Sequence, residues 1–309
     1  MLNRYLTTYS PAMQFVVFCA ILSMCWFTGG TFGEMWSVKF TGLKAEQIST
    51  MSSIPHSLSE TLKWMNGILL IILLLIPALL FAYLAYPYPL EYLGFRRVSN
   101  PSYYVLAFLL LCMALPFSSV IEQGCRDLPF FQKFHENDEQ YNRMASSMLF
   151  ADTVPALLKN LLAVCLLPAL IEEIFFRGCL QQLLLHWMKK YTWLVLILVA
   201  AIFSAFHGQM SGFLPRLYLG LILGIVYYLS GSIWLSIGLH FLNNAISVVL
   251  AWLFHSHILK GSMETLPDVP LWIGIPAGLL SVLVIVVWYR KRIPFPVYQW
   301  IDEPENSNE

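Results

Sequence analysis

Charged residues are scarce in this chain. Asp, Glu, Lys and Arg make up only 12% of its 309 residues, whereas hydrophobic types make up 58% and the mean hydropathy is +0.66. A soluble domain has about 25% charged residues. The deficit extends along the whole chain, which excludes a soluble domain with one anchor and predicts a polytopic membrane protein. The formal net charge is zero and no basic stripe is present to contact phosphates, so we expect no nucleic acid partner.

Paired cysteine motifs are also missing. No Cys-x-x-Cys pair occurs, which argues against a redox motif and against a zinc knuckle. Most of the six cysteines lie in apolar runs, where a free thiol behaves as a small hydrophobic side chain. They are Cys19, Cys25, Cys112, Cys125, Cys165 and Cys179.

Eight apolar runs have close to the ~20 residues that a helix needs to cross a bilayer. They lie near residues 11–31, 67–86, 102–121, 156–176, 192–209, 213–229, 233–254 and 271–289. We therefore predict an all-α fold, a polytopic transmembrane bundle of about eight spans. Arg4 precedes the first run and no small-residue cleavage site stands out, so we interpret this run as a retained helix rather than a removed signal peptide.

The other segments predict connections rather than further domains. The long connection 122–155 contains FHENDEQYNR, which is typical of a solvated polar loop, and the tail IDEPENSNE has the composition of a disordered segment. Gly220 and Gly224 have the small-xxx-small spacing of a helix-packing face. We divide the chain into N-terminal membrane helices with their loops, a helical core, and a last span with a polar tail. These parts are residues 1–155, 156–255 and 256–309.

Basic residues in short connections predict the orientation of the bundle. Lys and Arg are enriched in short cytoplasmic loops. In this chain such residues follow the second, fourth and eighth runs, so we expect both termini to be cytoplasmic. They are Arg96, Arg97, Lys189, Lys190, Arg290, Lys291 and Arg292.

Polar residues inside the predicted spans indicate where the chemistry lies. A charge at the centre of a membrane helix costs roughly 2.5–3.5 kcal/mol, and such groups usually face a bundle interior or a wet cavity. Arg216 begins the sixth run, at what we take to be a mouth. The other polar groups fall in the fourth, fifth and seventh runs, which predicts one shared site. They are Glu172, Glu173, Arg177, His207, His240 and Asn244.

Helix geometry separates the roles of the two glutamates. Glu173 precedes Arg177 by four residues, the favourable order for an ion pair on one face, so we expect Arg177 to neutralise and orient Glu173. Glu172 lies about 100° round the helix, so the two carboxylates are not expected to point at one place. Glu172 and His207 stand at equal distances from the turn predicted at 189–190, ~25 Å away, and so at one depth.

These residues have the groups that amide hydrolysis requires. Glu172 with His207 can hold and deprotonate a water, while His240 and Asn244 can donate hydrogen bonds to the oxyanion that forms on a carbonyl. Glu172, His207 and His240 can alternatively bind zinc, although no HExxH signature is present. Separately, each observation has a plainer structural explanation. The Glu173–Arg177 pair can be a helix clamp, and Phe203 can simply pack.

Three motifs resemble those of a known family. EEIFFR (172–177) resembles EExxxR, FSAFH (203–207) resembles FxxxH, and HFLNN (240–244) resembles HxxxN. In this order they are similar to the motifs of the CPBP intramembrane proteases. That family includes the type II CAAX prenyl endopeptidases and bacterial abortive-infection and bacteriocin-immunity proteins. The resemblance covers about residues 172–250.

The resemblance implies an activity and residue roles within the 156–255 core. Glu172 and His207 would activate the water, and His240 and Asn244 would form the oxyanion site. Glu173, Arg177 and Phe203 would support them. We favour a metal-free glutamate mechanism, with no cofactor, over the zinc alternative. The substrate would be a peptide or protein segment that arrives from the bilayer or the cytoplasmic face; type II members cut prenylated C-termini.

Two other functions are compatible with the same bundle. A transporter with a proton relay also uses intramembrane Glu and His, but we find no inverted repeat and no matching pair of broken helices. A non-catalytic scaffold or immunity factor is the other alternative. The presence of every polar motif residue argues against it.

Overall fold

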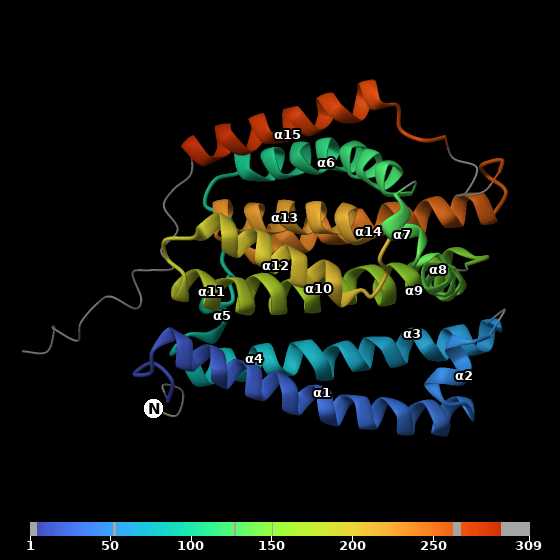
Figure 1. Ribbon diagram of the computed structural model, residues 1–309, viewed down its shortest axis with the longest axis horizontal. Coiled ribbons are helices and arrows are strands. Elements are labelled where there is room, and N and C mark those ends of the chain that lie inside the picture. Colours follow the sequence, from blue (N-terminus) through green and yellow to red (C-terminus); the bar gives the residue numbers. More distant parts are fainter. Residues whose placement is uncertain (1–4, 52–53, 127, 150, 262–266, 292–309) are drawn as a thin grey trace, which may run out of the picture.

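Every regular element is a helix in the described part of the computed structural model, which comprises residues 5–51, 54–126, 128–149, 151–261 and 267–291 (Figure 1). This confirms the all-α prediction; the predicted disordered tail lies outside these residues. In chain order the elements are α1 (Pro11–Thr41), α2 (Ala45–Ser49), α3 (His56–Leu70), η1 (Ile71–Leu75), α4 (Ile76–Ala85), α5 (Pro89–Tyr92), α6 (Ser102–Arg126), α7 (Pro129–Gln132), α8 (His135–Leu149), α9 (Val154–Asn160), η2 (Leu161–Leu166), α10 (Leu167–Glu173), η3 (Ile174–Gln181), α11 (Gln182–Trp187), α12 (Thr192–Phe206), α13 (Phe213–Ser230), α14 (Ile233–His255) and α15 (Leu271–Lys291).

Seven continuous helical stretches among the described residues are long and apolar enough to cross a membrane, so the chain is an integral, multi-pass membrane protein. They are Pro11–Thr41, His56–Ala85, Ser102–Arg126, Val154–Trp187, Phe213–Ser230, Ile233–His255 and Leu271–Lys291. The first two extend beyond their predicted ranges into the connection expected at 32–66, because their polar ends continue the helix past the apolar window. Gly42, with φ 73°, stops the first of them.

The fifth predicted span, 192–209, is shorter than expected. Its helix, α12, ends at Phe206, where Gly208 adopts a left-handed conformation with φ +71°. Fifteen residues give ~22 Å, less than the ~30 Å of a hydrocarbon core. His207 therefore lies in the loop that joins α12 to α13, not inside a helix.

Two prolines coincide with π-helical turns. Pro77 follows η1 and Pro168 follows η2, each two residues after the π-helical segment ends. Proline has no N–H to donate to the preceding turn, and the wider i→i+5 turn absorbs that missing bond. The π-helical turn before Pro168 thus lies one short helical segment ahead of the glutamates, which end α10.

The helices stack in layers (Figure 1). Helix α1 packs on the α3–α4 rod at one side of the molecule, and α15 packs on α6 at the other. The elements that carry or adjoin the site residues lie between these layers; they are α10, η3, α12, α13 and α14. The middle of the bundle therefore buries the predicted site.

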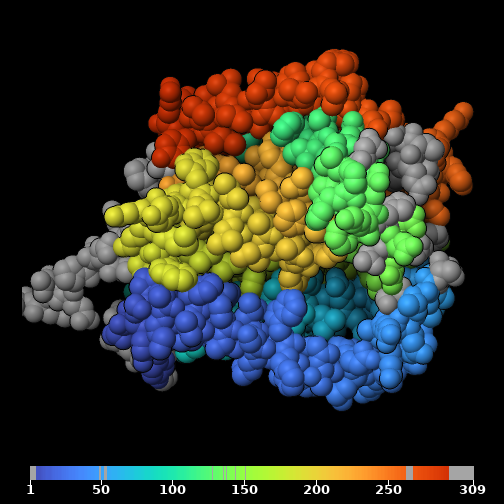
Figure 2. All heavy atoms as spheres, viewed as in Figure 1, coloured from blue at the N-terminus to red at the C-terminus, as the bar shows by residue number. Residues whose placement is uncertain are grey.

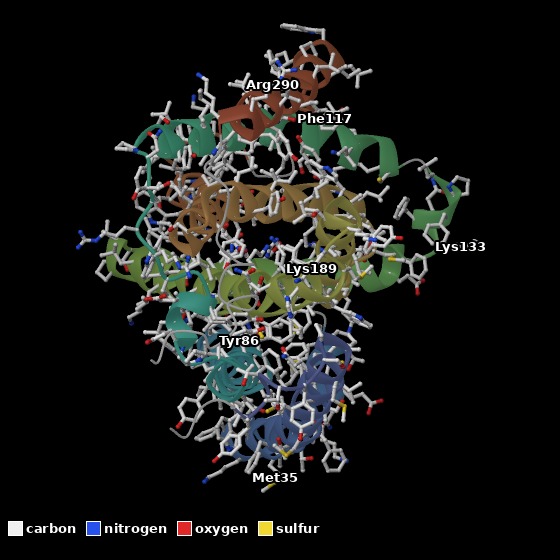
Figure 3. All side chains as sticks on the ribbon, turned by 90° about the vertical axis from the view of Figure 1, so that its left-hand side faces the viewer. Met35, Tyr86, Phe117, Lys133, Lys189 and Arg290 are labelled. Atoms are coloured by element: carbon white, nitrogen blue, oxygen red, sulfur yellow. The ribbon has the colours of Figure 1, made fainter. Side chains whose placement is uncertain are left out.

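The two ends of the bundle are formed by different elements. The start of α1, α5, the α11–α12 turn and the C-terminal end of α15 lie at the same end in Figure 1. Figure 3 views the molecule from that end and labels Lys189 and Arg290. The polar helix α8 lies at the opposite end, beside the α12–α13 loop (Figure 2).

The segment predicted as a polar loop within 122–155 is mostly helical, so that prediction is wrong. FHENDEQYNR runs into α8, an amphipathic helix whose first turn carries Glu136 and Asp138, where acids suit the helix dipole. Met148 faces the interior cavity, and Ser59 of α3 donates a hydrogen bond to the carbonyl of Ser147 (2.6 Å). Only one side of α8 contacts the bundle, so the helix has few apolar residues and its composition resembles that of a loop.

Gly94→Ala is expected to destabilise the fold by about 2–4 kcal/mol. Gly94 has φ +86°, and an added Cβ would lie 2.5 Å from the buried ring of Tyr227. Its carbonyl also accepts from the amide of Ile233 (2.9 Å). Thermal unfolding in detergent, followed by circular dichroism, measures the effect. Gly124→Ala is the control, since a Cβ there meets nothing within 4 Å; equal melting temperatures for both variants would contradict the argument.

Candidate active site

Glu172 faces two histidines from other parts of the chain. Its Oε2 lies 3.9 Å from Nε2 of His207 and 3.9 Å from Nε2 of His240, and only 7% of Glu172 is exposed. Glu172 comes from α10, His240 from α14, and His207 directly follows α12. The structure thus brings together three residues that were predicted to converge, and the expected common depth of Glu172 and His207 is correct.

Hydrogen bonds on the far side of each ring fix the tautomers. Nδ1 of His207 lies 2.9 Å from the carbonyl oxygen of Phe203, which can only accept, so Nδ1 is the donor. Nδ1 of His240 lies 2.8 Å from Oε1 of Glu173, a carboxylate that is paired with an arginine and also accepts. In the neutral rings both Nε2 atoms are therefore acceptors, and both face Oε2 of Glu172.

Each of the two 3.9 Å separations is one that a single water molecule can bridge. Two hydrogen bonds of ~2.8 Å that meet at about 90° span 3.9 Å, the separation found between Oε2 and each Nε2. A water can donate to two of these atoms at once and retains a lone pair on its oxygen. The arrangement can therefore hold a nucleophilic water next to a carboxylate base.

Glu173 and Arg177 form the predicted ion pair. Nη1 of Arg177 donates to Oε1 of Glu173 at 2.8 Å, and both side chains are fully buried. The guanidinium also donates to the carbonyl of Gly220 (2.8 Å) and lies 4.5 Å over the ring of Phe203. Phe203 therefore contacts both the buried cation and the His240 ring, and the 81° angle between the two ring planes, with centroids 5.7 Å apart, indicates edge-to-face contact with His240.

One expectation about the glutamates is wrong. Their 100° offset was taken to keep them from one target, yet both approach the imidazole of His240, because that ring has nitrogens on two sides. Glu173 binds Nδ1, and Glu172 faces Nε2. The four side chains therefore lie in the order Arg177, Glu173, His240 and Glu172, each next to the one before it.

The two small residues of α13 make room for this chain. A Cβ on Gly220 would lie 2.9 Å from the ring of Phe203, and one on Gly224 would lie 2.9 Å from Oε1 of Gln181. Gln181 donates to the carbonyl of Gly224 (3.1 Å), one turn beyond the bond from Arg177 to Gly220. The predicted packing role of this pair is confirmed. Gln181 was missed, although a second polar residue four positions after Arg177 was a usable signal.

Asn244 lies on the same cavity wall as His240 but is not bonded to it. In the described part of the chain its only side-chain hydrogen-bond partner is Asn243, whose Nδ2 donates to Oδ1 of Asn244 (3.3 Å). Its own amide N–H groups are thus available to a ligand. A cavity of about 750 Å³ contains Glu172, His207, His240 and Asn244 along its lining.

Two cationic residues also line this cavity. Arg216, which was expected at a mouth, is a half-buried residue of the cavity lining, and its Nη2 donates to Oε1 of Gln209 (2.6 Å). Lys63, only 4% exposed, was not predicted as a site residue, because the second span was predicted to start at residue 67. Lys63 contacts Glu60 and donates to Oδ1 of Asn160 (2.8 Å), which links α3 to α9 at the cavity edge.

The donor atoms suit zinc in type but are widely spaced. Tetrahedral zinc with bonds of 2.0–2.1 Å needs ligand atoms about 3.3 Å apart, whereas Glu172 Oε2 stands 3.9 Å from each Nε2. No group of three or more His, Cys, Asp or Glu among the described residues is arranged to hold a metal ion. Glu172, His207 and His240 would have to close in on a metal.

Comparison with known families supports the resemblance seen in the motifs. Residues 154–246 match the family model described as type II CAAX prenyl endopeptidase Rce1-like. The resemblance to the CPBP family is thereby confirmed, and the matched segment includes every predicted site residue. No curated protein and no solved structure matches the chain. Helix α8 lies outside the matched segment.

Proposed function

We propose that this membrane protein, whose residues 154–246 match the Rce1-like family, is an intramembrane endopeptidase in which Glu172 and His207 activate the attacking water. The observation that carries the proposal is the position of Oε2 of Glu172, 3.9 Å from two histidine nitrogens that both accept hydrogen bonds. A carboxylate and one of these acceptors can hold a water by its two protons, which leaves a lone pair on its oxygen for attack, as general-base catalysis needs.

The reaction then follows from the positions of these groups. Glu172 takes a proton from the water while the water oxygen attacks the peptide carbonyl carbon. The oxyanion that forms accepts from the amide of Asn244. The proton held by Glu172 passes to the leaving nitrogen as the C–N bond breaks, and two peptides result with no covalent intermediate.

The role of His240 in this scheme depends on whether its ring is neutral or carries a second proton. Its Nδ1 donates to Glu173, so Nε2 of the neutral ring can orient the water but cannot donate to the oxyanion. The oxyanion role implied by the family resemblance requires the imidazolium form, flanked by Glu173 and Glu172. We assign His240 to water orientation in the resting site and to oxyanion donation when it is protonated.

The layout of the bundle bears on orientation and on substrate access. We propose that both termini are cytoplasmic, since the basic loops and the C-terminal end of α15 share one end of the bundle (Figures 1 and 3). The cavity is also lined by Tyr141, Ala145 and Met148 of α8, which lies at the opposite end. This geometry favours a peptide segment that arrives from the bilayer over one that arrives directly from the cytoplasm.

Peptide cleavage by the purified protein tests the function. Wild type in detergent is incubated with a library of quenched-fluorescent peptides, half of them with a farnesylated cysteine four residues from the C-terminus. Cleavage with product masses that fit one hydrolysed bond is expected. Comparative proteomics of membrane peptides from cells that hold wild type or Glu172→Ala identifies natural substrates. Absence of any cleavage difference in both experiments would remove the proposal.

A chelator is expected to leave cleavage within about twofold of the untreated rate, because the mechanism routes no step through a metal. The measurement compares enzyme dialysed against EDTA or 1,10-phenanthroline with enzyme dialysed against buffer alone. Full loss of activity with recovery on addition of zinc would favour the alternative, in which Glu172, His207 and His240 bind the metal.

A further inference from the structure

Helix α8 is hydrogen-bonded to the loop that starts with His207. Both carboxylate oxygens of Asp138 accept backbone bonds from that loop: Oδ1 from the amide of Met210 (2.9 Å) and Oδ2 from the amide of Ser211 (2.7 Å). Asp138 is only 4% exposed. A buried carboxylate with two charge-assisted bonds to consecutive amides is a strong and directional contact. It joins a helix outside the family match to a loop inside it.

Besides Asp138, the side chain of Gln209 ties this loop to Asn142 (2.8 Å) and Arg216 (2.6 Å), and the amide of Phe213 donates to the carbonyl of Met210 (3.0 Å). It connects α12 to α13, and Gly208 turns it with φ +71°. The amide N–H groups of Met210 and Ser211 precede α13, and Asp138 is the acceptor that each of them has among the described residues. At the base of the loop, Ser204 donates to the carbonyl of Phe213 (2.6 Å). Asp138 is the contact from α8 that acts directly on the loop backbone.

The position of His207 depends on the position of this backbone. Among the described residues its ring bonds only to the carbonyl of Phe203, four residues earlier on its own segment, and it faces Glu172 across 3.9 Å. No described hydrogen bond ties the His207 ring to another helix. Displacement of the loop therefore moves Nε2 relative to Oε2 of Glu172, and a shift of about 1 Å at a reacting group can cost ~100-fold in rate.

We propose that Asp138 is a positioning residue for catalysis, which holds the loop at residues 207–212 so that His207 faces Glu172. The inference rests on the proposed peptidase function and extends its machinery to α8. The exposed bond from Gln209 to Asn142 (2.8 Å) runs between side chains and does not restrain the loop backbone in the same way.

Substitution of Asp138 tests this role on the library peptide that wild type cuts fastest. Asp138→Ala is expected to lower kcat by about 30–100-fold and to leave KM within about twofold. Asp138→Asn is expected to lower kcat by only about 5–10-fold, since its Oδ1 still accepts one amide while its Nδ2 faces the other. Glu136→Gln removes a charge from the exposed side of the same helix and should keep the wild-type kcat. Thermal unfolding of each variant is recorded beside the kinetics.

The outcomes separate positioning from folding and from the proposed function itself. A wild-type kcat for Asp138→Ala, a change in KM alone, or a kcat loss that equals the loss of folded protein would overturn the positioning role. If Asp138→Ala does not fold, the size-matched Asp138→Asn variant decides the question by the same criteria. If Glu172→Gln is inactive while both Asp138 variants are normal, only the positioning role fails. If Glu172→Gln cleaves like wild type, the peptidase mechanism fails first.

Discussion

Glu172→Gln is expected to abolish peptide cleavage, with kcat at least about 10³-fold below wild type. General-base catalysis contributes typically 10²–10⁴-fold, and this change removes the only carboxylate that faces both histidine Nε2 atoms. The variant should fold at least as well as wild type. Glu172 is 7% exposed and accepts no described hydrogen bond, so the neutral amide is the cheaper group to bury. The rate on the fastest-cut library peptide and the melting temperature in detergent are the two measurements.

Glu122→Gln is the matched control for this result. Glu122 lines the same cavity, so the substitution makes the same chemical change in that cavity and leaves Glu172, the carboxylate that faces the histidines, in place. Its rate should stay within about threefold of wild type, as expected of a group outside the reacting set. Cleavage by Glu172→Gln at the wild-type rate would sink the mechanism, whatever the control shows.

Spacing along helices predicted most of the site. The i, i+4 relation of Glu173 and Arg177 gave the buried pair, and equal counts from the α11–α12 turn gave the depth of Glu172 and His207. Both work because helical rise and periodicity are nearly constant. The same reasoning was wrong for the two glutamates. Helical periodicity gives the direction in which a side chain leaves the helix, but it does not show that one imidazole ring can contact both carboxylates through its two nitrogens.

The features that the sequence did not reveal are a polar segment that forms a helix and an apolar run that includes a loop. FHENDEQYNR was interpreted as a loop because its composition is polar, yet Asp138 is one of the buried acids of the molecule. A helix that covers the end of a bundle has few apolar positions, so periodicity barely marks it. The end of α12 at Phe206 was missed for a related reason: a window of hydropathy continues across a loop that is itself covered by α8.

Arg177→Met is expected to destabilise the protein by about 3–5 kcal/mol, which lowers the melting temperature by about 10 °C or more. The substitution leaves the carboxylate of Glu173, fully buried, without its cation, and it deletes the bond to the carbonyl of Gly220. Arg126→Met is the control. Arg126 pairs with Asp268 at 2.8 Å on the surface, where such a pair contributes about 0–1 kcal/mol.

The double variant Glu173→Leu/Arg177→Leu decides what this ion pair is for. Two leucines remove both buried charges, so stability is expected to return to within about 1–2 kcal/mol of wild type. Activity is expected to remain about 10²-fold down, because Nδ1 of His240 has lost the carboxylate that holds its tautomer and ring orientation. Recovery of both stability and the wild-type rate would reduce the pair to a helix clamp. Recovery of stability alone means that Arg177 and Glu173 act on the reaction through His240.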